Sequence, residues 1–275
     1  MTINCKGQLI DLSLPKVMGI LNVTPDSFFD GGTYKDEGDI LNQVEAMSKA
    51  GATFIDVGGY SSRPGAADVS LDDELKRVIP VVELILKHFP ETLISIDTFR
   101  SKVAEQGIKL GAALINDISA GKLDVAMMST IGKLGVPYIM MHLKGNPKTM
   151  QQQTNYNDLV KEVVSYFAER ITAAHAVNIN DIIIDPGFGF AKTTEQNYEL
   201  LSSCQSLKLL DKPMLIGVSR KSMIYKTLNT TSEHALNGTT ALHMVALQKG
   251  ASIMRVHDVK EAMECVTLYN QLTAN

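Results

Sequence analysis

The chain has 275 residues, 45% of them hydrophobic, which allows one large core and lies near the roughly 250 residues of a typical α/β barrel. A net charge of -4 and a pI near 5.9 argue against the clustered basic face of a nucleic-acid-binding protein. No segment approaches the ~18 apolar residues of a membrane span, and Met1 to Asp11 lacks the apolar core of a signal peptide, so we expect a cytoplasmic protein without membrane or nucleic-acid partners.

Short apolar runs that end in polar residues recur along the whole chain. After a short hairpin predicted in Ile3–Leu14, each run is short enough for a strand that is buried on both faces. The eight predicted strands are Lys16–Val23, Phe54–Gly59, Leu93–Thr98, Leu114–Ser119, Tyr138–Leu143, Ile182–Gly187, Pro213–Ser219 and Ile253–Asp258.

Segments with helical periodicity separate these strands. Ser70-Leu-Asp-Asp73 resembles a capping box, and the apolar stripe of the helix that follows is predicted as Leu71, Leu75, Val78, Ile79, Val82 and Leu86. Pro80 is expected to kink that helix. A second long helix is predicted from Leu159, Val160, Val163, Val164, Phe167 and Ile171.

Strands that alternate with helices predict a parallel sheet. Eight of them suit a single (β/α)₈ TIM barrel with a short N-terminal hairpin, and we expect residues 1–275 to form one domain. The alternative is an open doubly wound sheet, but no GxGxxG fingerprint follows any predicted strand. Cys5, Cys204 and Cys265 contain no CxxC pair, so buried thiols in a reducing compartment are expected rather than disulfides or a zinc site.

The functional groups of such barrels lie at the carboxyl ends of the strands. The predicted strand ends carry Asn22, Asp56, Asp97, Asn116, His142, Asp185, Ser219-Arg220-Lys221, Arg255 and His257. Any single strand-terminal Asp or Asn has about even odds of capping the next helix instead. We expect that structural role for Asp56, whereas so many polar groups at one end predict a recognition site.

The chemistry of these groups suits a flat heterocycle beside an anion. Carboxylates and an amide accept hydrogen bonds from ring N–H groups, and Lys221 donates to a carbonyl or a ring nitrogen. Arg255 and His257 alternate along the last strand, so both side chains point to one face and are expected to bind an anion. A satisfied core histidine is the alternative for His257 taken alone.

Two long loops follow the first two barrel strands. They are Asn22-Val-Thr-Pro-Asp-Ser-Phe-Phe-Asp-Gly-Gly32 and Gly58-Gly-Tyr-Ser-Ser-Arg-Pro-Gly65. Both combine glycine and proline with polar and aromatic side chains, and their length predicts mobile lids over the site. The alternative is that they are simply long connections.

Motifs along nearly the whole chain resemble those of the dihydropteroate synthase family, a sulfonamide target. They are Gly19-Ile-Leu-Asn-Val-Thr-Pro-Asp-Ser-Phe28, Ser61-Ser-Arg-Pro-Gly65, Ser95-Ile-Asp-Thr98, Ile115-Asn-Asp-Ile118, Asp185-Pro-Gly-Phe-Gly-Phe190, Gly217-Val-Ser-Arg-Lys-Ser222 and Arg255-Val-His257. The resemblance implies condensation of 6-hydroxymethyl-7,8-dihydropterin diphosphate with p-aminobenzoate. The products would be 7,8-dihydropteroate and pyrophosphate, with Mg²⁺ as cofactor and a homodimer as the assembly.

The resemblance also implies a role for each matching residue. The pterin would be bound by Asp97, Asn116, Asp185 and Lys221, and the diphosphate by Asn22, Arg63, Arg255 and His257. The p-aminobenzoate pocket would consist of Phe28, Ser62, Arg63, Pro64, Phe190 and Ser222. Asn22 would be the protein ligand of the metal, and the catalytic residues would be Asp97, Lys221, Arg255 and His257.

The second-loop motif departs from the family pattern, in which a Glu commonly stands where this chain has Tyr60 and a Thr where it has Ser62. Ser62 keeps a hydroxyl, but Tyr60 removes a charge. Three other functions stay open at this point. They are a pterin-dependent corrinoid methyltransferase, a Schiff-base aldolase that uses Lys221, and a non-catalytic pterin-binding protein.

Overall fold

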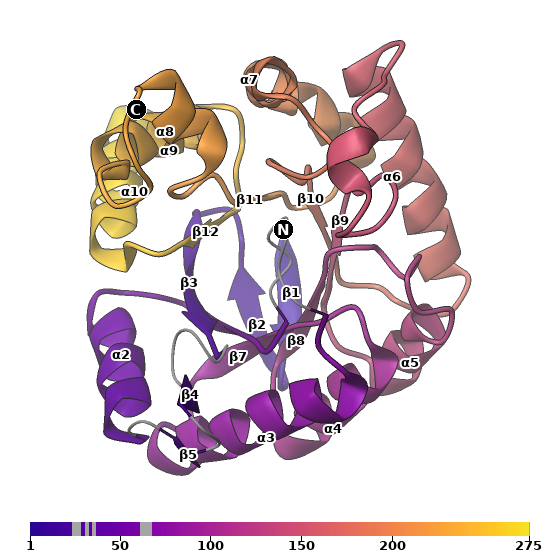
Figure 1. Cartoon of the computed structure of the whole chain (residues 1–275), viewed down its shortest axis with the longest axis vertical. Helices are drawn as coiled ribbons and strands as arrows, with labels where there is room; N and C mark the ends of the chain where they lie inside the picture. The colour runs from indigo at the N-terminus through magenta and orange to yellow at the C-terminus, as the bar shows by residue number, and fades with distance from the viewer. Residues whose placement is uncertain (24–28, 31–32, 35–36, 61–67, 275) are drawn as a thin grey trace.

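The structure is a computed structural model that describes residues 1–23, 29–30, 33–34, 37–60 and 68–274. Its centre is an eight-stranded sheet that curls into a barrel, with helices around the outside (Figure 1). A small antiparallel pair, β4 (Phe29–Asp30) and β5 (Thr33–Tyr34), lies after the first barrel strand.

All neighbouring strands of the barrel are parallel, as predicted. In chain order they are β3 (Lys16–Asn22), β6 (Phe54–Gly58), β7 (Leu93–Asp97), β8 (Leu114–Asp117), β9 (Tyr138–Met141), β10 (Ile182–Asp185), β11 (Leu215–Ile216) and β12 (Ile253–Val256). The sheet order is β10-β9-β8-β7-β6-β3-β12-β11. A single parallel bridge between Ile184 and Met214 joins β10 to the segment before β11, so the ring is nearly closed.

The N-terminal hairpin closes one end of this ring. Strands β1 (Thr2–Cys5) and β2 (Gln8–Asp11) pair antiparallel, and they share one apolar cluster with the first residues of the barrel strands. In that cluster Ile3 and Cys5 pack with Met18, Phe54 and others, each less than a tenth exposed. The strand starts are therefore covered, and the carboxyl ends of the strands form the mouth at the other end of the barrel.

The outer helices cover the apolar faces of the strands (Figure 1). The α-helices are α2 (Glu37–Lys49), α3 (Leu71–His88), α4 (Ser101–Leu110), α5 (Met127–Leu134), α6 (Leu159–His175), α7 (Thr194–Ser203), α8 (Ser222–Thr227), α9 (Leu236–Gln248) and α10 (Val259–Thr273). Two 3₁₀ segments, η1 (Met150–Gln152) and η2 (Cys204–Leu210), complete the chain. Helix α6 buries four residues of its predicted stripe, Leu159, Val163, Phe167 and Ile171, whereas Val160 and Val164 are half-buried.

Helix α3 differs from its prediction in the face that it buries. Ser70 caps its first turn by accepting from the Asp73 N–H, as predicted, and the helix continues through Pro80. However, Leu71 is exposed, whereas Glu74 is fully buried. Val78 and Val82 are buried as predicted, but Val81 and Ile85 are buried with them. Glu74 can occupy an inward position because its carboxylate is paired with Thr98 and Arg100.

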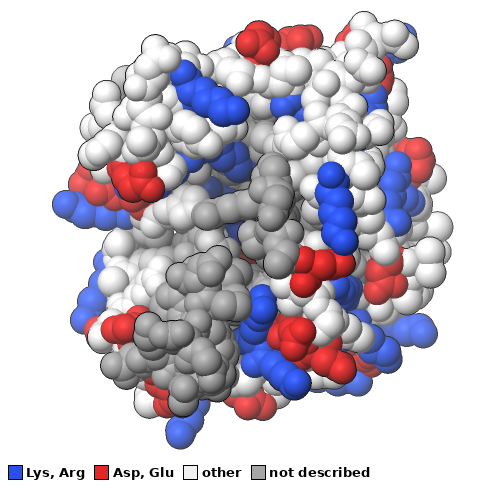
Figure 2. All heavy atoms as spheres, in the orientation of Figure 1, with Lys and Arg blue, Asp and Glu red and all other residues white. Residues whose placement is uncertain are grey.

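The structure also bears on expectations drawn from composition. Cys5, Cys204 and Cys265 are all buried free thiols, as expected. None of the described helices has the length and apolar character needed to cross a membrane. Lys and Arg side chains are interspersed with Asp and Glu over the face shown in Figure 2.

Candidate active site

The predicted polar residues lie together at the carboxyl ends of the barrel strands. The β6–β7 register places Gly58 opposite Asp97, and the β7–β8 register places Asp97 opposite Asn116. Asp185 ends β10, and Arg255 lies within β12. Because all these strands are parallel, the side chains converge on one mouth.

Arg255 is the centre of the charge network in this mouth. Its Nε donates to Oδ2 of Asp56 at 2.6 Å, and its Nη2 donates to Oδ2 of Asp97 at 2.7 Å. Burial and the neighbouring carboxylate of Asp56 raise the pKa of Asp97 to about 7, although Arg255 opposes the shift. Burial alone would lower the pKa of Arg255, but the two carboxylates raise it, so the guanidinium stays charged.

Asp56 does not cap a helix, so that expectation was wrong. It lies inside β6, is fully buried, and also accepts from the amide nitrogen of Asn116 at 3.1 Å. Its second oxygen, Oδ1, is buried and has no hydrogen-bond partner among the described residues. Asp56 therefore orients both Arg255 and Asn116, and it leaves the Asn116 Oδ1 as the acceptor that can meet a ligand N–H.

Asp185 and Lys221 form the opposite side of the mouth. Burial raises the pKa of the Asp185 carboxyl, against the attraction of Lys221. Burial lowers the pKa of Lys221 to about 8, against the attraction of Asp185. Lys221 Nζ donates to the Phe188 carbonyl at 2.6 Å and lies 5.2 Å from the centre of the Phe190 ring. The loop after β10 thus supplies a carboxylate acceptor and an aromatic ring, and Lys221, which precedes α8, brings a cationic donor beside them.

His257 lies just after β12 and is solvent-exposed. The Ser219 hydroxyl lies 3.0 Å from its Nδ1 and accepts from its backbone N–H at 3.1 Å. Because the hydroxyl oxygen accepts that N–H, its own proton is available for Nδ1. If the Ser219 proton is directed to Nδ1, the neutral ring carries its own proton on Nε2, which is the tautomer that can donate to an anion.

Two further predicted residues lie at this end of the barrel. Asn22 ends β3 and is partly exposed, and Ser222 is the first residue of α8. Among the described residues, no group of three or more His, Cys, Asp or Glu side chains is arranged to hold a metal ion. Asn22 thus offers a single amide oxygen.

Phe28, Ser62, Arg63 and Pro64 lie outside the described residues, so their predicted roles and the predicted lids stay predictions. The described residues on either side of 61–67 are held together. Tyr60 donates to Asp68 at 3.4 Å, and its ring meets Phe99 edge-on with the centres 5.0 Å apart. Arg100 lies 5.4 Å from the Tyr60 ring and bonds the Val69 carbonyl at 2.6 Å.

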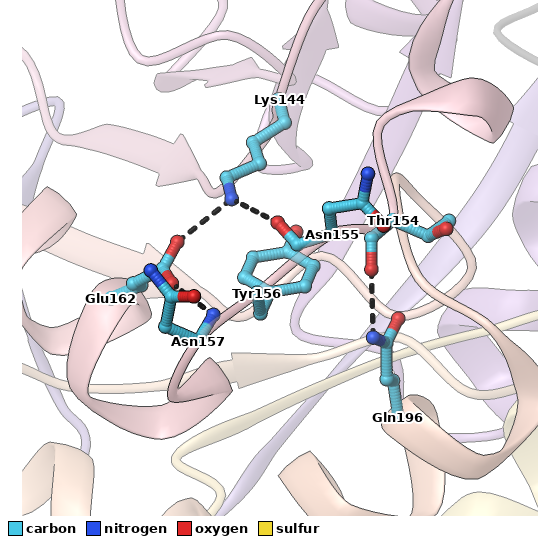
Figure 3. Close-up of a pocket in the computed structure, with 7 residues that line it drawn as sticks. All are labelled: Lys144, Thr154, Asn155, Tyr156, Asn157, Glu162 and Gln196. Carbon is cyan, nitrogen blue, oxygen red and sulfur yellow. Dashed lines mark hydrogen bonds and ion pairs between the residues drawn. The ribbon is translucent and has the colours of Figure 1, made fainter.

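The sequence analysis missed the residues that hold the loop after β10. Lys192 and Asn197 are buried there and bond its backbone. Beside this loop is a surface pocket of about 560 Å³ lined by Lys144, Thr154, Asn155, Tyr156, Asn157, Glu162 and Gln196 (Figure 3). The sequence signal for Lys192 is its place two residues after the motif Asp185-Pro-Gly-Phe-Gly-Phe190, because hydrophobic periodicity does not indicate that a lysine side chain is buried against the preceding turn.

Comparisons with known proteins agree with this geometry. The family described as "Pterin binding enzyme" matches residues 18–257. The dihydropteroate synthase of Escherichia coli K12 is 46% identical over 272 residues, which cover 97% of this chain and 94% of that protein. The Haemophilus influenzae synthase is 39% identical over 277 residues, with 100% of both chains covered.

Solved structures of such enzymes superpose over the whole chain. Yersinia pestis dihydropteroate synthase in complex with a sulfonamide drug has a TM-score of 0.93 at 41% identity, and 100% of each chain is covered. The Xanthomonas albilineans enzyme with 4-aminobenzoic acid has a TM-score of 0.92 at 37% identity, with 100% of this chain and 98% of that chain covered.

Proposed function

Because the chain belongs to the pterin binding enzymes, and to the dihydropteroate synthases within that family, we propose that it joins 6-hydroxymethyl-7,8-dihydropterin diphosphate to p-aminobenzoate. The products are 7,8-dihydropteroate and pyrophosphate. The protein is therefore a transferase of folate biosynthesis, acting on an alkyl group other than methyl.

One observation carries this conclusion. The 46% identity extends over 97% of the chain, and the same stretch contains both the Asp97–Asn116 edge and the Arg255–His257 pair at one mouth. A corrinoid methyltransferase or a pterin-binding protein without activity would use the Asp97–Asn116 edge to bind the pterin. Neither would need the Arg255–His257 pair as a diphosphate site. Lys221 is already bonded to the Phe188 carbonyl, which does not favour the aldolase alternative.

We assign pterin recognition to Asp97, Asn116, Asp185 and Lys221. The carboxylates and the Asn116 amide oxygen would accept from the ring N–H and amino groups, and Lys221 would donate to the ring carbonyl. These groups are mostly buried before any ligand binds, so their hydrogen-bonding capacity is already oriented. Preorganised polar groups in a water-poor site bind charge and dipoles more strongly than groups that must reorganise.

The reaction breaks the bond between the methylene carbon of the pterin and the diphosphate oxygen. Arg255 and His257 would stabilise the negative charge that grows on the departing pyrophosphate. The carbon left behind shares its positive charge with the pterin ring, and the carboxylates of Asp97 and Asp185 would favour that charge. The nitrogen of p-aminobenzoate then forms the new C–N bond and releases one proton.

We propose Mg²⁺ as the cofactor, with Asn22 as its protein ligand. A single amide oxygen fits Mg²⁺, which commonly keeps several waters and takes its remaining oxygens from substrate phosphates. When bound, Mg²⁺ would supply neutralisation of charge on the leaving group. Asn22 would then orient the diphosphate toward Arg255 and His257.

The arylamine is already nucleophilic and needs mainly positioning. We propose that Phe28, Ser62, Arg63, Pro64, Phe190 and Ser222 form its pocket, and that Arg63 also contacts the diphosphate. Of these, Phe190 lies beside Lys221, on the side of the mouth where the methylene carbon of a bound pterin would react. A homodimer in the cytoplasm is the assembly that we expect from the family.

The test is an assay of pyrophosphate release from the pterin diphosphate with Mg²⁺, with and without p-aminobenzoate. A synthase should release pyrophosphate at a rate that depends on p-aminobenzoate, and it should form dihydropteroate in equal amount. Pterin binding without pyrophosphate release would instead identify a carrier, and methyl transfer from a pterin would identify the methyltransferase.

A further inference from the structure

Lys192 is a buried cation that none of the roles above uses. It follows the turn after β10, and only 4% of it is exposed. Its Nζ lies 3.0 Å from His142 Nδ1, 3.0 Å from the Gly187 carbonyl and 3.1 Å from the Phe190 carbonyl. No ion pair joins it to a carboxylate within the described residues. An ammonium group with three donors thus meets three acceptors, which offsets much of the cost of burying it.

These acceptors belong to the two loops at the ends of β9 and β10. Gly187 has a φ of +70°, and a Cβ built on it would lie 2.3 Å from the His142 carbonyl oxygen. The turn therefore packs directly against the end of β9. Lys192 bonds both parts, so its side chain fixes the position of the turn on the barrel.

The whole turn is held by side chains rather than by a regular ladder. Lys192 donates to the Gly187 and Phe190 carbonyls. The carbonyls of Phe188, Gly189 and Ala191 also accept hydrogen bonds from side chains. The remaining donors are Lys221 to Phe188 at 2.6 Å, Gln151 to Gly189 at 3.2 Å and Tyr156 to Ala191 at 2.9 Å. Of these donors, only Lys192 is both buried and bonded to two of the carbonyls.

We propose that Lys192 is a positioning residue for pterin binding, because it holds the turn whose Phe188 carbonyl orients Lys221 and whose Phe190 ring faces that lysine. This inference rests on the proposed role of Lys221 and Asp185 in pterin recognition. Lys192 itself touches no substrate in this role. It acts through the turn that Lys221 needs as its acceptor.

His142 is the partner that makes this arrangement compatible with burial. Burial and the nearby Lys192 lower the pKa of His142 to about 2, so its ring is neutral and Nδ1 can accept. Burial lowers the pKa of Lys192 to about 7, against the attraction of Asp185. A neutral Lys192 would still have two N–H groups for the two carbonyls, so the turn keeps both bonds in either protonation state.

The experiment compares Lys192→Met and His142→Phe, alone and together, with a matched control. His142→Phe keeps an aromatic ring against Tyr166, whose ring centre lies 4.8 Å away, but removes the Nδ1 acceptor. The control is Lys144→Met in the neighbouring pocket (Figure 3). Lys144 bonds Glu162 and the Asn155 carbonyl, each at 2.7 Å. It makes no hydrogen bond to the turn itself and approaches it only through the Tyr156 ring, whose centre lies 3.8 Å from its Nζ.

The measurement is the affinity for 6-hydroxymethylpterin by calorimetry, with urea unfolding of each variant alongside. Lys192→Met should weaken pterin binding at least tenfold, and His142→Phe should weaken it less, because it removes one acceptor of three. The double variant should bind no more weakly than Lys192→Met alone. Lys144→Met should lower stability yet keep pterin affinity within about twofold.

The inference would be overturned if Lys192→Met bound 6-hydroxymethylpterin as tightly as the wild type. It would also be overturned if the losses of affinity in the two single variants added fully in the double variant. So would an equal loss of affinity in Lys144→Met, because the effect would then follow general destabilisation. The proposed function is tested separately by the wild-type protein, which would fail to bind 6-hydroxymethylpterin at all if the site were assigned wrongly.

Discussion

Arg255 Nε and Asp56 Oδ2 lie 2.6 Å apart although 199 positions separate them in the chain. This contact joins β12 to β6, which lie on either side of β3 in the sheet, and it fixes one edge of the guanidinium. Nη2 is held by Asp97, and no hydrogen bond to another described residue uses Nη1. Arg255 therefore approaches its ligand in an orientation that Asp56 sets.

Asp56→Asn should weaken binding of the diphosphate substrate, because it replaces a charge-assisted bond to Arg255 with a neutral one. A bond to a charged group contributes ~1.5–3 kcal/mol, so we expect the KM for the pterin diphosphate to rise about tenfold or more. Steady-state kinetics measure this. Glu162→Gln, which breaks the Lys144 pair in the neighbouring pocket, is the control that should leave KM unchanged. Equal KM values in Asp56→Asn and the wild type would contradict the orienting role.

Arg255→Ala should weaken the diphosphate substrate at least tenfold more than the free 6-hydroxymethylpterin, because the proposed contact is with the leaving group. Some loss is expected for both ligands, since Asp56 and Asp97 would face each other without their shared cation. Calorimetry with the two ligands gives the ratio. An equal loss would show that Arg255 supports the ring instead, for example by lying against its face.

Asp185→Asn and Asn116→Ala should abolish measurable pterin binding and leave the fold intact. Asp185→Asn removes the negative charge of one proposed acceptor, and Asn116→Ala removes the other acceptor. A bond to a charged group contributes on the order of 1.5–3 kcal/mol, and a buried donor left without its partner costs about 1–3 kcal/mol. Calorimetry with 6-hydroxymethylpterin and circular dichroism measure binding and fold. If both variants bound the pterin as tightly as the wild type, the recognition edge would have to lie elsewhere.

The buried His243 should make the free energy of unfolding sensitive to acid. The ring is 1% exposed and both of its nitrogens lack partners among the described residues, and burial lowers its pKa to about 4. The folded protein keeps the ring neutral, while the unfolded chain takes up a proton below its ordinary pKa of 6.5. Stability is therefore lost as the pH falls from 6.5 toward 4, by on the order of 3 kcal/mol.

Urea unfolding of His243→Leu at pH 7.5 and 4.5 tests this. The loss of stability between the two pH values should be smaller by about 2 to 3 kcal/mol than in the wild type, while stability at pH 7.5 should change little. His175→Asn alters an exposed histidine and should keep the wild-type pH dependence. An unchanged pH dependence in His243→Leu would assign the acid sensitivity to other groups.

The barrel could be predicted from the sequence because its signal is local and repeated. All eight predicted strands were found, and each one except β11 starts at the residue that the apolar run indicated. Their ends were predicted one to three residues too long, because the last polar residues belong to the loops. The motifs likewise located Asp97, Asn116 and Asp185, since each ends or nearly ends a strand.

What the sequence could not predict depends on contacts between distant segments. Asp56 and Asn116 are equivalent in sequence pattern, yet Asp56 is the fully buried partner of Arg255. Glu74 is not part of the predicted apolar stripe of α3, yet it is fully buried because Thr98 and Arg100 are its partners. Lys192 gave no periodic signal at all. In each case a polar group is buried because a remote residue compensates it.

The hairpin of β1 and β2 determines by which end of the barrel substrates enter and products leave. It seals the strand starts with Ile3, Cys5 and their neighbours, and the Asn4 N–H is tied to Asp181 at 2.8 Å. Both substrates must enter, and both products must leave, by the same mouth. Bound dihydropteroate blocks entry of the next pterin substrate, so the rate of product release sets an upper limit on turnover.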